Sequence, residues 1–287
     1  MRPLATALLT ISFSFIVSLT LASPVWAADI WYLGQKIPDP QQPWRASDYA
    51  LLQKALKQID LSQPDALPRR SGEYTGAIYR RLISEENFRY QLNIYLPLEL
   101  RQLEAQAMLE QLKELMRVYF NFRAKLQPYG SEALGLMSYS LRQQAVQFTL
   151  TVEYWTTLAK NEQQNPARLQ GLAETKQGAA MLTSSALDYL ALTSQFGHHD
   201  LALYANELAA LMPELYVHLD IEARDELRTR LTTLASDHPL PPVKNALADL
   251  LPVLQVVETD LRDKSAQPLT AEPAPKPNLN LKFEPDF

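Results

Sequence analysis

A helical stripe of apolar residues between Pro97 and Leu126 constrains the fold of this chain more than any other feature. Its members recur every three, four or seven residues: Leu98, Ala105, Met108, Leu112, Leu115, Tyr119, Phe122 and Leu126. That spacing places all of them on one face of a single long helix. Such a face has to be buried, so the stretch predicts a core helix around which other helices pack.

A second long helix is expected directly after the first. Pro128 and Gly130 end the first helix, and Ser131 can cap a segment that runs to about Lys160 with an apolar face of its own. A connection of about four residues makes neighbouring helices antiparallel. The resulting helical hairpin would cover the stripe within one molecule, which favours a monomer over a coiled-coil dimer joined through that face.

The whole sequence predicts an all-α protein, a bundle of about seven or eight helices built on that hairpin. The chain has only eight glycines in 287 residues, too few for the turns of a hairpin-rich β protein. We assign residues 28–264 to one domain. Within it, residues 28–46 contain prolines and aromatic residues and are expected to form an extended strap against the bundle. The proline-rich tail, residues 265–287, is expected to be disordered.

Capping residues place the later helices. Asn165 followed by Pro166 is a strong helix start, and Asp220 can cap another helix. Pro213 is expected to restart or kink the chain. The helix that opens at Pro166 is rich in small residues, among them Gly171 and Gly178. Small side chains allow a neighbouring backbone to approach closely, and they also allow a helix to line a cavity.

The first residues have the features of a secretory signal peptide. Arg2 is followed by an apolar run from Leu4 to Leu21, and Val25 and Ala27 occupy the −3 and −1 positions of a cleavage site. We expect residues 1–27 to be removed and the mature chain to be periplasmic in a bacterium, without an integral membrane segment. The alternative is an uncleaved anchor, since about 18 apolar residues reach the lower edge of membrane-spanning length.

Charge and composition restrict the partners. Removal of residues 1–27 takes away one arginine and no acid, which changes the net charge from −5 to −6. Nucleic acid requires a basic surface and is therefore excluded as the main partner. The chain has no cysteine, so it forms no disulfide and carries no thiol chemistry. It also lacks the glycine-rich phosphate loops of nucleotide-binding proteins, and we expect no cofactor.

Two carboxylates are the candidate catalytic residues. Glu153 lies among Tyr154, Trp155 and threonines, and burial beside aromatic rings can raise a carboxyl pKa into the range of a general acid. Asp188 lies on the small-residue helix and would face a cavity if that helix lined one. The alternative for both is an ordinary place on a helix surface, where most acids are found.

A metal site is the other candidate. His198, His199 and Asp200 join two imidazoles to a carboxylate at a helix start, a donor set that zinc accepts. Adjacent residues entering a helix point in different directions, however, whereas a helical metal pair needs i, i+4 spacing. The alternative is that these are polar residues at a helix terminus.

The end of the tail alternates apolar and polar residues, with Leu279, Leu281 and Phe283 on one side. This is the pattern of a half-buried strand, and such a segment can add to the sheet edge of a partner. Two hypotheses follow from the sequence. The first is a non-catalytic periplasmic protein that binds or scaffolds another envelope component, an envelope protein above all. The second is a periplasmic metal-binding protein or enzyme that uses a carboxylate and histidine site.

Overall fold

The computed structural model describes residues 30–32, 34–58, 67–73, 75–93, 95–126 and 129–266, with the backbone alone at 121–126 and 264–266. Within these residues the chain forms nine α-helices, eight of them of seven or more residues, and one two-stranded sheet. The fold is all-α, as predicted. The predictions for residues 1–27, for a disordered tail after Ala266, and for Leu279, Leu281 and Phe283 concern residues outside the described ranges, while residues 265 and 266 are helical.

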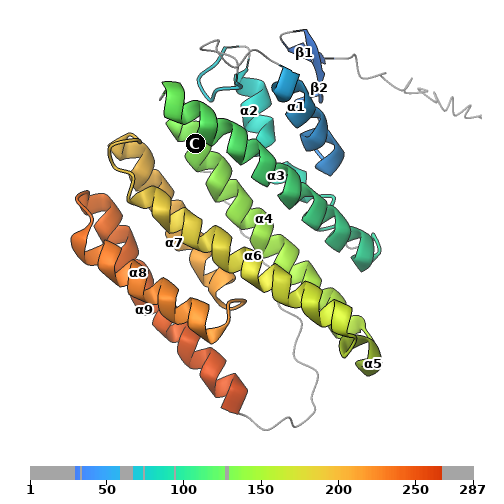
Figure 1. Ribbon diagram of the computed structural model, residues 1–287, viewed down its shortest axis with the longest axis vertical. Helices are drawn as coiled ribbons and strands as arrows, with labels where there is room; N and C mark the ends of the chain where they lie inside the picture. Colours follow the sequence, from blue (N-terminus) through green and yellow to red (C-terminus); the bar gives the residue numbers. More distant parts are fainter. Residues whose placement is uncertain are drawn as a thin grey trace, which may run out of the picture.

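The predicted hairpin consists of α3 (Leu98–Leu126) and α4 (Gly130–Thr157), which run antiparallel (Figure 1). Five members of the α3 stripe are completely buried: Ala105, Met108, Leu112, Leu115 and Tyr119. They are covered by α4 on one side and by α1 (Ala46–Gln58) on the other. The apolar stripe is therefore covered within the molecule.

The N-terminal strap is extended, but it folds back on itself. Strand β1 (Ile30–Tyr32) pairs antiparallel with β2 (Gln35–Ile37), and Gly34 makes the turn with φ +78°. Only glycine adopts this left-handed conformation without strain. Tyr32, Ile37 and Trp44 are buried, as expected for a strap, whereas the side chain of Trp31 faces solvent.

Two short helical segments follow α1 and complete this layer. Helix α2 (Gly76–Leu82) is followed by a break at Ser84 and a 3-10 turn (Glu85–Phe88), which begins with Ser84 Oγ accepting a hydrogen bond from Glu86 N. The strap, α1 and α2 lie on the side of the molecule opposite α8 and α9 (Figure 1).

The second half of the chain forms two further layers on the other side of α4. The short helix α5 (Lys160–Gln163) leads into α6 (Pro166–Leu190), and α7 (His198–Tyr216) returns beside α4. Helices α8 (Ile221–Asp237) and α9 (Pro241–Ala266) pair at the far edge (Figure 1). Because α4 contacts α3, α6 and α7, it is the central helix of the bundle.

Two of the three predicted caps begin helices, whereas Ser131 lies within the first turn of α4, whose N-cap residue is Tyr129. Asn165 Oδ1 accepts a hydrogen bond from Ala167 N, and Asp220 Oδ1 accepts one from Ala223 N. Helix α7 continues through Pro213, so the proline does not restart the chain. The buried side chains form one continuous cluster from Tyr32 to Leu254. Among the helices described, none is both long enough and apolar enough to cross a membrane.

Candidate functional site

A groove runs between α3, α4 and α6. Its volume is about 340 Å³, and its lining residues extend along α3 from Gln102 to Lys113, along α4 from Gln144 to Leu158 and along α6 from Arg168 to Gly178. The groove exists because α6 contributes no buried residue before Ala179. The first half of α6 therefore lies beside α4 without packing into the core. At a rise of about 1.5 Å per helical residue, the α4 side is about 21 Å long. The site is thus elongated and open.

Two buried glutamines form part of the wall contributed by α4. Gln144 is 1% exposed and Gln147 is 5% exposed, and Gln144 Nε2 donates a hydrogen bond of 2.7 Å to Gln147 Oε1. Among the described residues, Gln144 Oε1 and Gln147 Nε2 have no protein partner. One acceptor and one donor therefore remain for a molecule in the groove. Neither atom is among the fully buried polar atoms of the described residues that lack a hydrogen-bond partner, so both are accessible from the groove.

An aromatic pair lies at the other end of the α4 wall. Tyr154 and Trp155 are half-buried and both line the groove. Arg168 Nη1 donates a 3.2 Å hydrogen bond to the Tyr154 hydroxyl, and its guanidinium also pairs with Glu162. The tyrosine is thereby held by α6, while the indole edge of Trp155 has no hydrogen-bond partner among the described residues.

The charged residues of the groove are largely neutralised by one another or by neighbours. Lys113 Nζ lies 3.0 Å from Glu110 Oε1 on the same helix, and Arg168 pairs with Glu162. Glu174 accepts a hydrogen bond from Gln170. The groove therefore offers amides, hydroxyls and aromatic rings to a ligand rather than a concentrated charge.

The small-residue helix α6 forms the third wall of the groove. Lining a cavity was one of the two arrangements that the sequence predicted for this helix. A Cβ atom added at Gly171 or Gly178 would meet no atom within 4 Å, whereas one added at Gly135 of α4 would lie 2.5 Å from the Tyr79 hydroxyl. Gly135 is thus required by internal packing, and the two α6 glycines are not. Their small size keeps the groove open.

Alanine at Gly171 and at Gly178 is expected to stabilise the protein by about 0.5–1 kcal/mol each, because glycine in a helix interior has the higher conformational entropy in the unfolded chain. Thermal and urea unfolding of the two variants would measure this gain. Gly135→Ala is the matched control and should destabilise the fold. A loss of stability at Gly171 or Gly178 would show that another part of the molecule occupies this space.

The two candidate acids lie on the surface and apart from each other. The Glu153 side chain is 52% exposed and pairs with Arg101 across the α3–α4 hairpin, with 3.6 Å between Oε1 and Nη2. Burial beside aromatic rings, the condition for a raised carboxyl pKa, is not met. Asp188 is 65% exposed and pairs with Arg230 of α8. Neither residue lines the groove.

The candidate metal ligands occupy the first turn of α7. His198 and His199 are exposed and Asp200 is half-buried. Within the described ranges, no group of three or more histidines and acids is close enough together to hold a metal ion. The structure places these side chains at a helix start, where adjacent residues point in different directions.

The other two histidines have internal contacts. His238 is 4% exposed; its Nδ1 accepts a hydrogen bond from Leu240 N, and its Nε2 donates to Leu190 O over 2.8 Å. His218 stacks on Phe148 of α4, with 4.4 Å between ring centroids. Burial, with a smaller contribution from the charge of Lys176, lowers the pKa of His218 from 6.5 to about 4.

This lowered pKa predicts acid sensitivity. Between pH 6.5 and 4 the unfolded chain binds a proton at His218 and the folded chain does not, so stability is fully present above this window and falls as pH falls through it. Allowing for partial exposure, we expect a loss of about 1–2 kcal/mol between about pH 7 and about pH 5. Urea unfolding at both values would measure it. His218→Gln should remove that part of the pH dependence, and an unchanged dependence would contradict the assignment.

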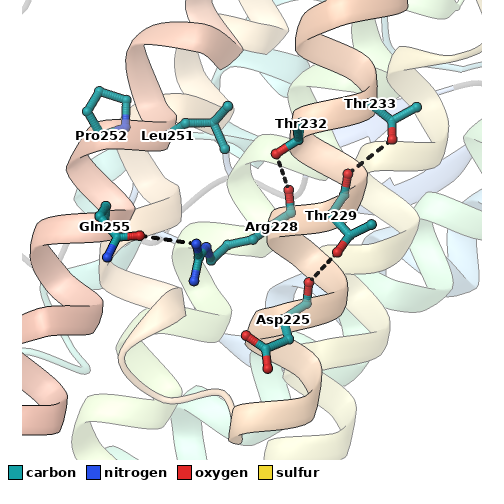
Figure 2. Close-up of a pocket in the computed structure, with 8 residues that line it drawn as sticks. All are labelled: Asp225, Arg228, Thr229, Thr232, Thr233, Leu251, Pro252 and Gln255. Carbon is teal, nitrogen blue, oxygen red and sulfur yellow. Dashed lines mark hydrogen bonds between the residues drawn. The ribbon is translucent and has the colours of Figure 1, made fainter.

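A second depression lies on the outer face of α8 and α9 (Figure 2). It is larger, about 690 Å³, but only these two helices border it. Its threonines are already bonded to carbonyls of their own helix, as with Thr229 to Asp225 O and Thr232 to Arg228 O, and Arg228 donates to Gln255 Oε1 (Figure 2). No buried polar side chain faces this depression. The groove between α3, α4 and α6 is therefore the better candidate site.

Sequence reasoning missed the groove glutamines. Gln144 and Gln147 are polar residues i and i+3 apart on a helix whose neighbours at Leu141 and Phe148 are apolar. Polar residues in such a segment are a signal for a buried polar contact. The relevant third wall, α6, comes from more than twenty residues further along the chain.

No protein-family model, no curated protein and no solved structure matches this chain.

Proposed function

We propose that this chain is a non-catalytic binding protein of the bacterial envelope, and that the groove between α3, α4 and α6 holds the envelope component on which it acts. The observation that carries the proposal is the pair Gln144 and Gln147. Both side chains are more than nine-tenths buried, both line an open groove, and each retains one amide atom without a partner among the described residues. Ligand sites typically combine such a concavity with a few fixed polar groups.

The chemistry of the lining supports binding rather than catalysis. Amides and hydroxyls hold a ligand by hydrogen bonds, and neither group titrates near neutral pH. Of the charged lining residues, Glu110, Lys113 and Arg168 are in ion pairs, and Glu174 accepts a hydrogen bond from Gln170. The surface acids Glu153 and Asp188 lie outside the groove and are paired with arginines.

Export is the second part of the proposal and rests on the sequence of residues 1–27. The exported protein is expected to begin at Ala28, and a full-length chain retained in the membrane would contradict it. N-terminal sequencing and the intact mass of the protein from a periplasmic extract would distinguish these outcomes.

The binding role is tested by photo-crosslinking in living cells. A photoreactive phenylalanine analogue placed at Gln106, an exposed groove residue of α3, should give a specific adduct in the envelope. The same analogue at Gln177, exposed on α6 and outside the groove, is the control. Gly178→Leu should abolish the adduct by filling the groove, whereas Ala173→Leu adds the same side chain outside it. Equal adducts at both crosslinking positions, or none at Gln106, would overturn the proposal.

A further inference from the structure

We infer that the C-terminal segment of this chain, residues 267–287, docks in the groove between α3, α4 and α6 and competes there with the envelope component. The inference rests on the proposed function, because it names a regulator of the same site. The segment follows α9 and lies outside the described ranges. Three arguments support it: the reach of the segment, the match between its residues and the groove lining, and the effect of its covalent tether.

The end of α9 is connected to the groove by a short path of contacts. The Tyr216 hydroxyl of α7 donates a 3.1 Å hydrogen bond to Glu258 Oε2 of α9. Two residues further along the chain, His218 stacks on Phe148 of α4, which is the chain neighbour of the groove residue Gln147. Helix α9 extends eight residues beyond Glu258, which corresponds to about 12 Å. Two side-chain contacts, a two-residue step and this length of helix therefore separate the start of the segment from the groove.

The segment is long enough for this path. Phe283 lies 17 residues beyond the end of α9, and an extended chain spans about 3.3 Å per residue, or about 56 Å over this distance. Four prolines occur between residues 268 and 277, and proline-rich linkers are extended spacers. The residues that follow the prolines can therefore reach the groove.

Residues 278–283, Asn-Leu-Asn-Leu-Lys-Phe, match the lining of the groove in pattern and length. Alternate side chains of an extended chain lie on the same side, which groups Leu279, Leu281 and Phe283 into one apolar edge about 13 Å long. The α4 wall is about 21 Å long and presents Trp155 and Leu158 at one end. The apolar edge can therefore lie along this wall.

The free amide atoms of the groove suit the backbone of an extended segment. The N–H and the C=O of one residue in an extended chain point to the same side. Gln144 Oε1 can accept from such an N–H and Gln147 Nε2 can donate to such a C=O, since neither atom has a partner among the described residues. Residues 278–283 carry a single charge, at Lys282, and the groove offers no concentrated charge to oppose it.

The covalent tether favours this segment over a free peptide of the same kind. A short flexible linker holds a segment at an effective concentration in the millimolar range. At about 1 mM, a segment whose free peptide binds with a Kd of about 100 µM occupies roughly nine-tenths of the grooves. A partner then finds only about one groove in ten open, which weakens its apparent affinity about tenfold.

Photo-crosslinking of the purified mature chain tests the contact directly. The photoreactive phenylalanine analogue at Gln106, in the groove, should form an intramolecular link to residues 278–287, identified by mass spectrometry of the monomer band. The same analogue at Gln177, outside the groove, should not form it. An equal link from Gln177, or no link from Gln106, overturns the inference. A link found only in a dimer band overturns it as well, because the segment would then dock on a second copy.

Peptide binding in trans measures the affinity. The chain that ends at Ala266 retains every described helix and the whole buried cluster. In fluorescence anisotropy it should bind a labelled peptide of residues 275–287 saturably and about tenfold more tightly than the full-length chain, whose own segment competes. A peptide with serine in place of its three apolar residues, Leu279, Leu281 and Phe283, is the matched probe and should not bind.

Two variants of the shortened chain locate the peptide. Gly178→Leu should abolish peptide binding by filling the groove, whereas Ala173→Leu adds the same side chain outside it and should leave binding unchanged. Binding that survives Gly178→Leu, or that is equal for the serine peptide, overturns the inference.

The envelope adduct in living cells separates this inference from the proposed function. Removal of residues 267–287 should raise the yield of the adduct at Gln106 several-fold, because the groove is then open to the partner. An unchanged yield refutes the competition, and a lower yield shows that the segment itself binds the partner, which also overturns the inference. Absence of the adduct from both chains refutes the proposed function, whereas the intramolecular link at Gln106 would still support docking of the segment.

Discussion

Asn87→Ala is expected to lower the free energy of unfolding by about 3–5 kcal/mol, because it leaves several buried polar groups without partners. Asn87 is 1% exposed, and its Oδ1 accepts a 2.9 Å hydrogen bond from Trp44 N. Its Nδ2 donates to the Tyr49 hydroxyl over 2.7 Å and to Arg81 O over 2.6 Å. One side chain thus joins the strap, α1, α2 and the 3-10 turn.

The effect of Asn87→Ala should extend to the central helix. The Tyr49 hydroxyl donates to Leu82 O and lies 3.2 Å from the Tyr139 hydroxyl of α4, which in turn donates to Ser84 O. Removing the amide disturbs the position of Tyr49 and hence this contact between the strap layer and α4. We therefore expect the loss to appear in the global unfolding transition rather than as local fraying.

Urea unfolding followed by circular dichroism would measure the loss. Asn93→Ala is the matched control, since Asn93 is exposed and, within the part of the chain that the structure describes, its side chain accepts a single local bond from Tyr95 N. The control should change stability by no more than about 0.5 kcal/mol. A loss below about 1 kcal/mol in Asn87→Ala would mean that the three partner groups find other hydrogen bonds.

The parts of the fold that were predictable depend on local signals. The stripe from Ala105 to Tyr119 identified α3 because burial of one helix face imposes a periodicity that survives in the sequence. Asn165 and Asp220 identified helix starts because a cap contacts backbone groups only two or three residues away. The short connection after α3 predicted the antiparallel hairpin, because the length of a connection is also a local feature of the sequence.

Other features depend on partners that are distant in sequence. Trp44 and Asn87 are 43 residues apart, and nothing near Asn87 distinguishes it from a surface asparagine. The prolines of the strap excluded a helix, but the pairing of β1 with β2 depends on a tight turn at Gly34. Helix α7 continues through Pro213 because the apolar residues around it, such as Met212 and Leu215, are completely buried and compensate for the lost backbone bond.

The candidate site was predictable only in part. The glycines of α6 indicated that something could approach that helix closely, but the sequence did not distinguish an internal neighbour from an open groove. The distinction requires the position of α3 and α4 beyond Gly171 and Gly178. Glu153 and Asp188 were chosen as candidate catalytic residues by residue type alone. In the structure they pair at the surface with Arg101 and Arg230, which are distant from them in sequence.

The second large effect is expected at Glu258, whose carboxylate joins the last three helices. The residue is 3% exposed on α9, and its Oε2 lies 3.1 Å from both Arg224 Nε of α8 and the Tyr216 hydroxyl of α7. Its Oε1 accepts a 2.9 Å hydrogen bond from Arg262. Burial acts to raise the pKa of Glu258, but the hydrogen bonds from Arg262 and Tyr216 and the charge of Arg224 outweigh it and hold the pKa below the ordinary glutamate range.

Glu258→Ala should therefore cost about 2–3 kcal/mol of unfolding free energy at neutral pH, because it leaves the largely buried guanidinium of Arg224 without its counter-ion. The value lies below that for a deep ion pair, since Arg262 is 69% exposed and water is close by. Glu226→Ala, at an exposed position of α8, is the control and should change the free energy of unfolding little.

A carboxylate whose pKa is lowered in the folded state stabilises the fold above its unfolded pKa, and this stabilisation is lost as pH falls through the folded pKa. The difference between wild type and Glu258→Ala, measured by urea unfolding, should accordingly shrink in acid, and a difference that grew there would show that the carboxylate is not held in its charged form.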